Sequence, residues 1–377
     1  MENHYILGIE RKDSGAFEHA WNLGQNLNEK GYSTRYFSNW WGNVPRELSL
    51  KDGSASELNL YKFKNLSGIF HLQTHVWEDS GYLEQIVNKK KSKIIYNLHA
   101  IIPYYYLGGE DKIKFLEGKL EPEKYEKIIK EKMSKREKTQ LITMEKADHL
   151  FVLAEGHKKV LEIMNIKKPI HIFENISDVE SMSKESLYNS MLKGKEFRRK
   201  INTDNAILYC GRLYEKKGSI GLFDSFDKIN KAYGNAKLIL LGSDKNNIEN
   251  LLKCGLKEEN IKDIVFVPWI KKDTTLEKEE FLKYYYASDV LIQPMITEKL
   301  FAKTVIDAMS IGLPAITCKS PYTIGTSKNS DEIFDSFVQF KENPKETKRI
   351  VEKAKKKVQE ENTWENYISR MREIVLR

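Results

Sequence analysis

The chain has 377 residues, of which 40% are hydrophobic and 31% are charged, a composition that excludes wholesale disorder and is sufficient for two buried cores. Its formal charge of +8 is mild for this length; it favours anionic partners such as phosphorylated ligands or a membrane surface. We expect no nucleic-acid partner. No apolar run approaches the roughly 18 residues of a membrane-spanning helix. The three widely spaced cysteines indicate a reducing compartment. We therefore expect a cytoplasmic protein, at most peripheral on the inner face of the membrane.

The first half of the chain opens with a strand, a loop and a helix. Residues 5–9 are an apolar run that predicts a strand, and a helix with one apolar face follows as far as Gly31. The polar loop between them ends at Gly15. A glycine at a helix start lets the backbone approach a diphosphate closely, although a plain turn glycine explains the same residue.

Four polar side chains follow the next two strands, which are predicted over 69–73 and 93–98. They are His75, Glu78, Asp79 and His99. Ligands of open parallel sheets bind beyond the carboxyl ends of the strands, so these residues are site candidates. A structural hydrogen-bonding role is the alternative for each histidine.

Residues 112–138 form a charged and mostly helical segment with ten Lys and Arg residues against six Asp and Glu residues. This pattern predicts either a solvated helix face with ion pairs between neighbours or a surface for an anionic membrane or a lipid-linked substrate.

A polar stretch over 181–203 lacks apolar periodicity and predicts an interdomain linker with one or two short helices. After it the alternation of strand and helix restarts, with strands predicted over 207–210, 237–242, 264–267 and 290–294. The predicted fold class is α/β, with two Rossmann-like, doubly wound domains over 1–180 and 204–363 that face each other across a cleft.

Two cations lie on the loop after the strand at 207–210. Arg212 and Lys217 are flanked by Gly211 and Gly218. Arginine offers a planar fork for two phosphate oxygens and lysine adds a point charge, and both suit a leaving diphosphate, whose developing charge must be neutralised. No cluster with metal-ligand spacing accompanies them, so we expect these cations to replace a divalent metal. A pair of surface cations is the alternative.

The stretch 295–317 predicts a loop, a helix and a strand. Its loop carries Glu298, and the helix starts near Lys303. The N–H groups and the positive dipole end of a helix start form a phosphate site. Asp307 lies about one turn after Lys303, where a carboxylate could accept hydrogen bonds from ribose hydroxyls. Such a unit occurs in any α/β protein, so the pattern alone does not fix the function.

Three segments together carry a family resemblance: GAFEHAWNLGQNL (15–27), CGRLYEKKG (210–218) and EKLFAKTVIDAMSIGLPAIT (298–317). They resemble retaining glycosyltransferases of the GT-B fold, family GT4, over nearly the whole chain. The resemblance implies transfer of a sugar from a nucleotide-sugar to an acceptor, with retention at the anomeric carbon and without a metal or other cofactor. A UDP-sugar, UDP-glucose or UDP-N-acetylglucosamine, is our leading hypothesis for the donor. It also implies that a C-terminal helix, about 364–377, returns to the first domain.

The resemblance implies a role for each matching residue. Arg212 and Lys217 would hold the diphosphate, and His99 would lie near the donor sugar. Gly15 would approach the diphosphate or the donor sugar from the first domain, and Trp269 would lie beside the base.

Within the stretch 295–317, Phe301, Ala302 and Lys303 occupy the loop whose backbone meets phosphate and sugar in this family, and Asp307 stands where the family usually has a ribose-binding glutamate. The family's first glutamate falls on Lys299 in an ungapped alignment, with Glu298 one place earlier. Either residue therefore remains a candidate for contact with the donor sugar.

The sequence leaves the acceptor open, and a sugar, an aminocyclitol, a polysaccharide or a lipid-linked acceptor would each fit the expected activity. Two alternative functions also remain. Lys299 and Asp307 depart from the family pattern, which suits a non-catalytic GT-B partner subunit. A GT-B nucleotide-sugar epimerase would act on the donor alone.

Overall fold

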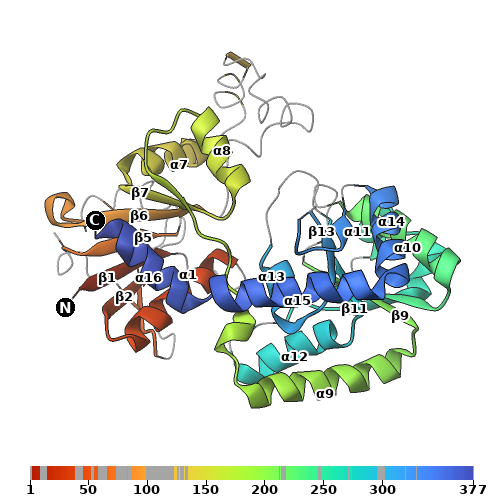
Figure 1. Ribbon diagram of the computed structural model, residues 1–377. Coiled ribbons are helices and arrows are strands. Elements are labelled where there is room, and N and C mark those ends of the chain that lie inside the picture. The colour runs from red at the N-terminus through yellow and green to blue at the C-terminus, as the bar shows by residue number, and fades with distance from the viewer. Residues whose placement is uncertain are drawn as a thin grey trace. The chain divides into compact units, whose positions relative to one another are not determined.

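The fold is taken from a computed structural model (Figure 1). The chain divides into two compact units: unit 1 is Met1–Glu174 with Trp364–Arg377, and unit 2 is Asn175–Thr363. The structure describes residues 2–8, 15–38, 46–51, 55–57, 66–73, 83, 87–98, 123–124, 127, 131, 135–211, 213, 218–244, 248–270, 272, 274–294, 302–318, 320–327 and 329–376. Among these residues, no helix combines the length and the apolar character needed to cross a membrane.

Unit 1 is built on an eight-stranded sheet with the order β4-β3-β2-β1-β5-β6-β7-β8. The strands from β2 to β8 in this order are parallel, and β3 and β4 are antiparallel additions at the edge. The strands are β1 (Asn3–Gly8), β2 (Ser33–Ser38), β3 (Arg46–Leu48), β4 (Ala55–Glu57), β5 (Ile69–Leu72), β6 (Lys93–Leu98), β7 (His149–Val152) and β8 (Ile170–Ile172). The helices of its first segment include α1 (Gly15–Glu29), α7 (Lys135–Lys146) and α8 (Glu155–Ile163).

The last helix, α16 (Trp364–Val375), belongs to unit 1, as expected for the C-terminal helix. Its buried residues recur every three or four positions, the spacing of one helix face: Trp364, Tyr367, Ile368, Met371 and Val375. The Tyr367 hydroxyl donates to Asn97 Oδ1 at 2.8 Å, near the carboxyl end of β6. The Tyr367 ring lies edge-on to Phe173, with ring centroids 4.7 Å apart. The buried face of α16 is therefore part of the core of unit 1.

Unit 2 is built on a six-stranded, all-parallel sheet with the order β11-β10-β9-β12-β13-β14. The strands are β9 (Asn205–Cys210), β10 (Ala236–Leu241), β11 (Ile264–Val267), β12 (Val290–Ile292), β13 (Ala315–Thr317) and β14 (Gly325–Thr326). The helices are α9 (Lys184–Ile201), α10 (Ser219–Tyr233), α11 (Ile248–Lys253), α12 (Thr275–Tyr286), α13 (Lys303–Ile311), α14 (Ser330–Glu342) and α15 (Pro344–Glu361), with a 3-10 turn η2 (Asp178–Ser181) near its start.

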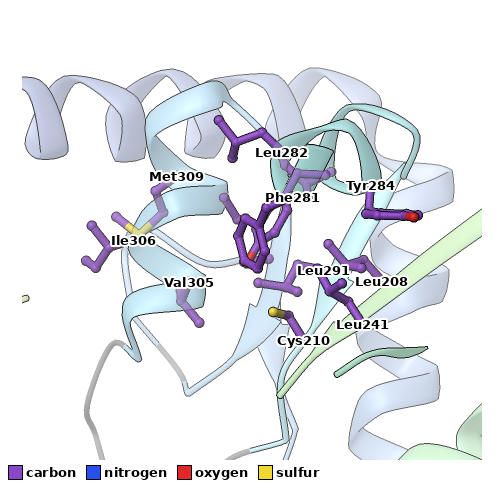
Figure 2. Close-up of a cluster of buried hydrophobic side chains, with 14 of the residues drawn as sticks. Leu208, Cys210, Leu241, Phe281, Leu282, Tyr284, Leu291, Val305, Ile306 and Met309 are labelled. Atoms are coloured by element: carbon purple, nitrogen blue, oxygen red, sulfur yellow. The ribbon is translucent and has the colours of Figure 1, made fainter. Parts of the chain in front are cut away.

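Helices cover both faces of the unit 2 sheet. Successive residues of a strand point to opposite faces, so each strand contributes apolar side chains to two cores. On one face Leu208 and Leu291 pack against residues of α12 and α13, such as Phe281 and Val305 (Figure 2). On the other face the core forms with α10 and α14. A parallel sheet buried on both faces explains why the sequence of these strands is continuously apolar.

The expected linker over 181–203 is wrong. Lys184–Ile201 form a single helix, α9, that packs beside α12 within unit 2 (Figure 1). Its buried positions are the small residues Ser186, Ser190 and Gly194; a Cβ on Gly194 would lie 2.8 Å from the carbonyl oxygen of Lys283. Small residues four apart let two helices approach closely, but they give no apolar periodicity in the sequence. Unit 2 also begins earlier than expected, at Asn175.

We expect Tyr367→Phe to lower the free energy of unfolding of unit 1 by about 1–3 kcal/mol, because the buried Asn97 oxygen loses its donor. Burial raises the pKa of Tyr367, so the hydroxyl remains a donor at neutral pH. Denaturant unfolding followed by hydrogen exchange in unit 1 measures the loss. Glu365→Ala is the control, since this side chain is 80% exposed and 3.9 Å from Lys30, and it should change little. Equal losses of unfolding free energy in both variants would show that the Tyr367–Asn97 hydrogen bond does not stabilise unit 1.

Candidate functional site

The sheet of unit 2 has a switch point at β9. This strand pairs with β10 on one side and with β12 on the other, so the chain builds the sheet outward in one direction and then in the other. Ligands of open parallel sheets bind at the carboxyl ends of the strands at such a point. The chain leaves β9 at Gly211 and β12 at Gln293, so the loops that carry Arg212 and the stretch 295–301 start from neighbouring strand ends.

Several expected site residues lie outside the described residues: Arg212, Lys217, His99, Glu298, Lys299 and Phe301, together with His75, Glu78 and Asp79. Their roles stay predictions, as does the choice between Glu298 and Lys299 as the residue facing the donor sugar. Most of the charged segment 112–138 also lies outside the described residues.

Gly15 is the first residue of α1. The preceding strand, β1, pairs with β2 on one side and with β5 on the other, so β1 is the switch strand of the unit 1 sheet. Gly15 therefore begins the helix that follows a switch strand, a position suited to backbone contact with a ligand. Its expected contact with the donor stays a prediction.

Trp269 lies where the loops after β9, β10 and β11 begin. A Cβ on Gly242 would lie 3.2 Å from Trp269 Cε3 and 3.2 Å from the carbonyl oxygen of Gly211. Gly211 and Gly242 have φ values of 137° and 103°, a region that favours glycine. The Trp269 side chain is 41% exposed. A partly exposed indole over a glycine backbone suits stacking with a flat base, and its position beside the base stays a prediction.

Among the residues that the structure describes, no side chain caps the start of α13. Ala302 is the N-cap residue, and its carbonyl accepts from the backbone N–H groups of Val305 at 2.8 Å and Ile306 at 3.2 Å. Lys303, expected in the loop, is the first residue of the helix. The N–H groups of a first helical turn have no intrahelical acceptor and can bind phosphate.

Asp307 faces inward from α13 and is 1% exposed. Its neighbours Val305, Ile306 and Met309 lie in the core (Figure 2). One carboxylate oxygen, Oδ1, accepts from Ser177 Oγ at 2.8 Å and from the backbone N–H of Asp178 at 3.0 Å. The other, Oδ2, has no hydrogen-bond partner among the described residues. Asp307 thus connects α13 with the segment that begins unit 2.

Asp178 lies between two lysines of the same unit. Its Oδ1 is 2.5 Å from Lys303 Nζ, and its Oδ2 is 2.6 Å from Lys272 Nζ. Burial alone would raise the pKa of Asp178, but the two ammonium groups outweigh burial and hold this pKa well below its usual range. Asp178 is therefore a permanent anion at neutral pH.

The neighbouring carboxyl, Asp307, behaves in the opposite way. Burial, together with the negative charge of Asp178, raises the pKa of Asp307 to about 6, although Lys272 and Lys303 oppose the change. Two carboxyls with pKa values pushed apart by their surroundings are typical of functional sites.

The sequence did not reveal Ser177, Asp178 or Lys272 as site residues. Ser177 and Asp178 follow strand β8 closely, so the strand-end rule that selects His99 could have selected them. Their contact with α13 is not readable from the sequence, because Ser177 and Asp307 are 130 residues apart.

Comparisons with known proteins agree with this architecture. Residues 193–371 match the family Glycosyl transferases group 1. An uncharacterized glycosyltransferase of Methanocaldococcus jannaschii is 29% identical over 178 residues, which are 46% of this chain and 41% of that protein. The matched segment thus spans less than half of that relative.

Solved structures match almost the whole chain. Sucrose-phosphate synthase from Thermosynechococcus elongatus has a TM-score of 0.71 at 14% identity and covers 99% of this chain and 98% of its own. The Anabaena protein HepE, solved in complex with UDP-glucose, has a TM-score of 0.64 at 11% identity and covers 99% of both chains.

Two doubly wound α/β units with these structural relatives define a protein of the GT-B fold. The match of residues 193–371 to Glycosyl transferases group 1 confirms the expected resemblance to group 1 glycosyltransferases. The expected classification as a transferase agrees with this family.

We expect Asp307→Asn to gain stability relative to the wild type as the pH rises. A carboxyl with pKa about 6 in the folded chain and about 4 in the unfolded chain contributes stability below pH 4 that is lost as the pH rises through 6. The free energy of unfolding of the wild type minus that of the variant should fall by roughly 1–3 kcal/mol between pH 4 and pH 7.5.

Denaturant unfolding at several pH values measures this difference. Asp331→Asn, at a side chain that is 81% exposed, gives the baseline for removing one carboxylate from unit 2. A difference that does not change with pH would show that Asp307 is not the buried carboxyl described above.

Proposed function

We propose that the protein is a retaining glycosyltransferase that moves a sugar from a UDP-sugar to a hydroxyl of an acceptor. The observation that carries this proposal is the start of α13, where no described side chain caps the helix and Lys303 is its first residue. This helix lies in unit 2, whose residues 193–371 match Glycosyl transferases group 1. A cation and free backbone donors at a helix start bind a diphosphate.

The donor is proposed to be UDP-glucose or UDP-N-acetylglucosamine. The similar HepE structures contain UDP or UDP-glucose, which supports a uridine nucleotide. In this chain Trp269 would stack on the base, and Asp307 would accept from the ribose through Oδ2, the oxygen without a partner among the described residues. Lys303 and the first turn of α13 would hold the diphosphate.

The chemistry needs the leaving diphosphate to gain negative charge as the bond to the anomeric carbon breaks. Arg212 and Lys217 would neutralise this charge together with the α13 start, so that no metal is required. The acceptor hydroxyl attacks the anomeric carbon from the face that the diphosphate leaves. Its proton passes to the leaving phosphate oxygen, and the configuration is retained.

The acceptor is proposed to be a hydroxyl of a small molecule, a glycan or a lipid-linked sugar. Unit 1 supplies the acceptor side in this proposal, from the loops after its parallel strands, where Glu78 and Asp79 follow β5. A UDP-release assay with monosaccharides, polyols, oligosaccharides and polyprenyl-linked sugars would identify the class.

We expect Arg212→Ala to lower kcat/KM for UDP-sugar turnover by about 100-fold or more, because one charge-stabilising group is lost from the transition state. Treatment with EDTA should leave the rate unchanged. UDP release, with the anomeric configuration of the product read by NMR, measures both expectations.

Arg199→Ala is the matched control, since Arg199 is an exposed arginine of α9 and should not affect turnover. Absence of UDP release with every donor and acceptor would contradict the activity and favour a non-catalytic subunit. Epimerisation of the donor without an acceptor would point to the epimerase alternative.

A further inference from the structure

Two residues that were not expected in the donor site contact two that were, Lys303 and Asp307. Ser177 is the N-cap and Asp178 the first residue of the turn η2, near the start of unit 2. They contact α13 in two ways: through the Asp307 carboxylate and through the ion pair of Asp178 with Lys303. The sequence assigns neither residue a role in the donor site. Their contacts therefore call for a separate physical account.

The two lysines beside Asp178 differ in their surroundings. The Lys272 side chain is 9% exposed, and its ammonium also lies 4.7 Å from the centroid of the Phe281 ring, a favourable cation–π distance. Lys303 is 20% exposed and stands at the first residue of α13. Lys272 is thus the more buried counter-ion of Asp178, and Lys303 is the one that belongs to the first turn of α13.

The geometry restricts a side chain that is otherwise flexible. A free lysine has about 2 kcal/mol of rotamer entropy, and part of this is lost when its ammonium must meet a ligand. Asp178 fixes the Lys303 ammonium through a charge-assisted hydrogen bond. Lys272 neutralises Asp178, so these three side chains carry one net positive charge (two lysines and one aspartate). Asp307, whose pKa is about 6, offsets part of that charge at neutral pH.

A second observation at the same place points to a ligand. Asp307 is 1% exposed, and its Oδ2 has no hydrogen-bond partner among the described residues. A buried acceptor without a donor costs free energy, and a hydroxyl of a bound ligand would supply that donor. The cationic group and the acceptor lie on the first two turns of one helix.

We propose that Asp178 is a positioning residue of the donor site, which holds the Lys303 ammonium at the start of α13 for the diphosphate of a nucleotide sugar. This inference rests on the proposed function. Asp178 acts through Lys303, and Lys272 makes this possible by balancing the buried carboxylate.

If Asp178 acted on the bound diphosphate only through its charge, its removal would have the opposite effect on affinity, and this difference allows a test. Removing a negative charge near a bound anion strengthens binding, whereas loss of positioning weakens it. Replacing Asp178 and Lys272 together, as Asp178→Asn with Lys272→Met, leaves the net charge of the cluster unchanged. Replacement of a buried ion pair by apolar or neutral groups is often neutral for stability, so this charge-balanced variant should fold.

The experiment is a mutant cycle with calorimetric affinities for UDP and uridine. The charge-balanced variant should weaken UDP binding by about tenfold and leave uridine binding within about twofold, because only UDP carries the diphosphate. Lys303→Met should show a similar loss. Adding the charge-balanced change to Lys303→Met should produce no further loss, because Asp178 acts through Lys303.

An unchanged UDP affinity in the charge-balanced variant, or an equal loss in the Lys303→Met background, would overturn the role of Asp178 while wild-type UDP binding still upheld the donor. A wild type that binds no nucleoside diphosphate would overturn the proposed function and this inference with it. Asp178→Glu is the second variant if the first does not fold. It keeps every charge, displaces the carboxylate by one methylene, and should weaken UDP binding but not uridine binding.

Discussion

A buried carboxylate must be paired, and the pairing of Asp178 organises one end of unit 2. Its two oxygens take one lysine each, Lys303 from α13 and Lys272 from the loop after β11. Three chain segments far apart in sequence are therefore held together by one charge. Removing one partner of such a group leaves an uncompensated buried charge and costs several kcal/mol, so the relative positions of these segments are strongly specified.

The pairing of Asp178 also affects the pKa of Asp307. With Asp178 held as an anion, the second carboxyl lies in a buried place beside a negative charge, and its pKa rises to about 6. Its position on α13 is fixed by core packing of the flanking residues. Side chains locked by a core and by hydrogen bonds form the preorganised kind of site that binding and catalysis require. Fold stability and site geometry thus depend on the same helix.

The sequence predicts the regular parts of this unit well, for local physical reasons. Continuous apolar runs predict β9 and β12, and the apolar spacing after Lys303 predicts α13. The two loops at the switch point follow from that alternation alone. The docking of Asp178 does not, because contacts across about 130 residues depend on how the sheet assembles. A polar residue such as Asp307 in a helix pattern is also read as solvent-facing, and only a buried partner like Ser177 reverses that expectation.

The resemblance described above leads us to expect a glutamate at 307, and the short distances around Asp307 favour the shorter side chain. Its Oδ1 already lies 2.8 Å from Ser177 Oγ and 3.0 Å from the N–H of Asp178. One more methylene would advance the carboxylate by about 1.5 Å, into the atoms that now donate to it. The segment would then have to retreat from α13, and Asp178 would lose its hold on Lys303. The shorter carboxylate and the Lys272–Asp178–Lys303 cluster therefore depend on each other.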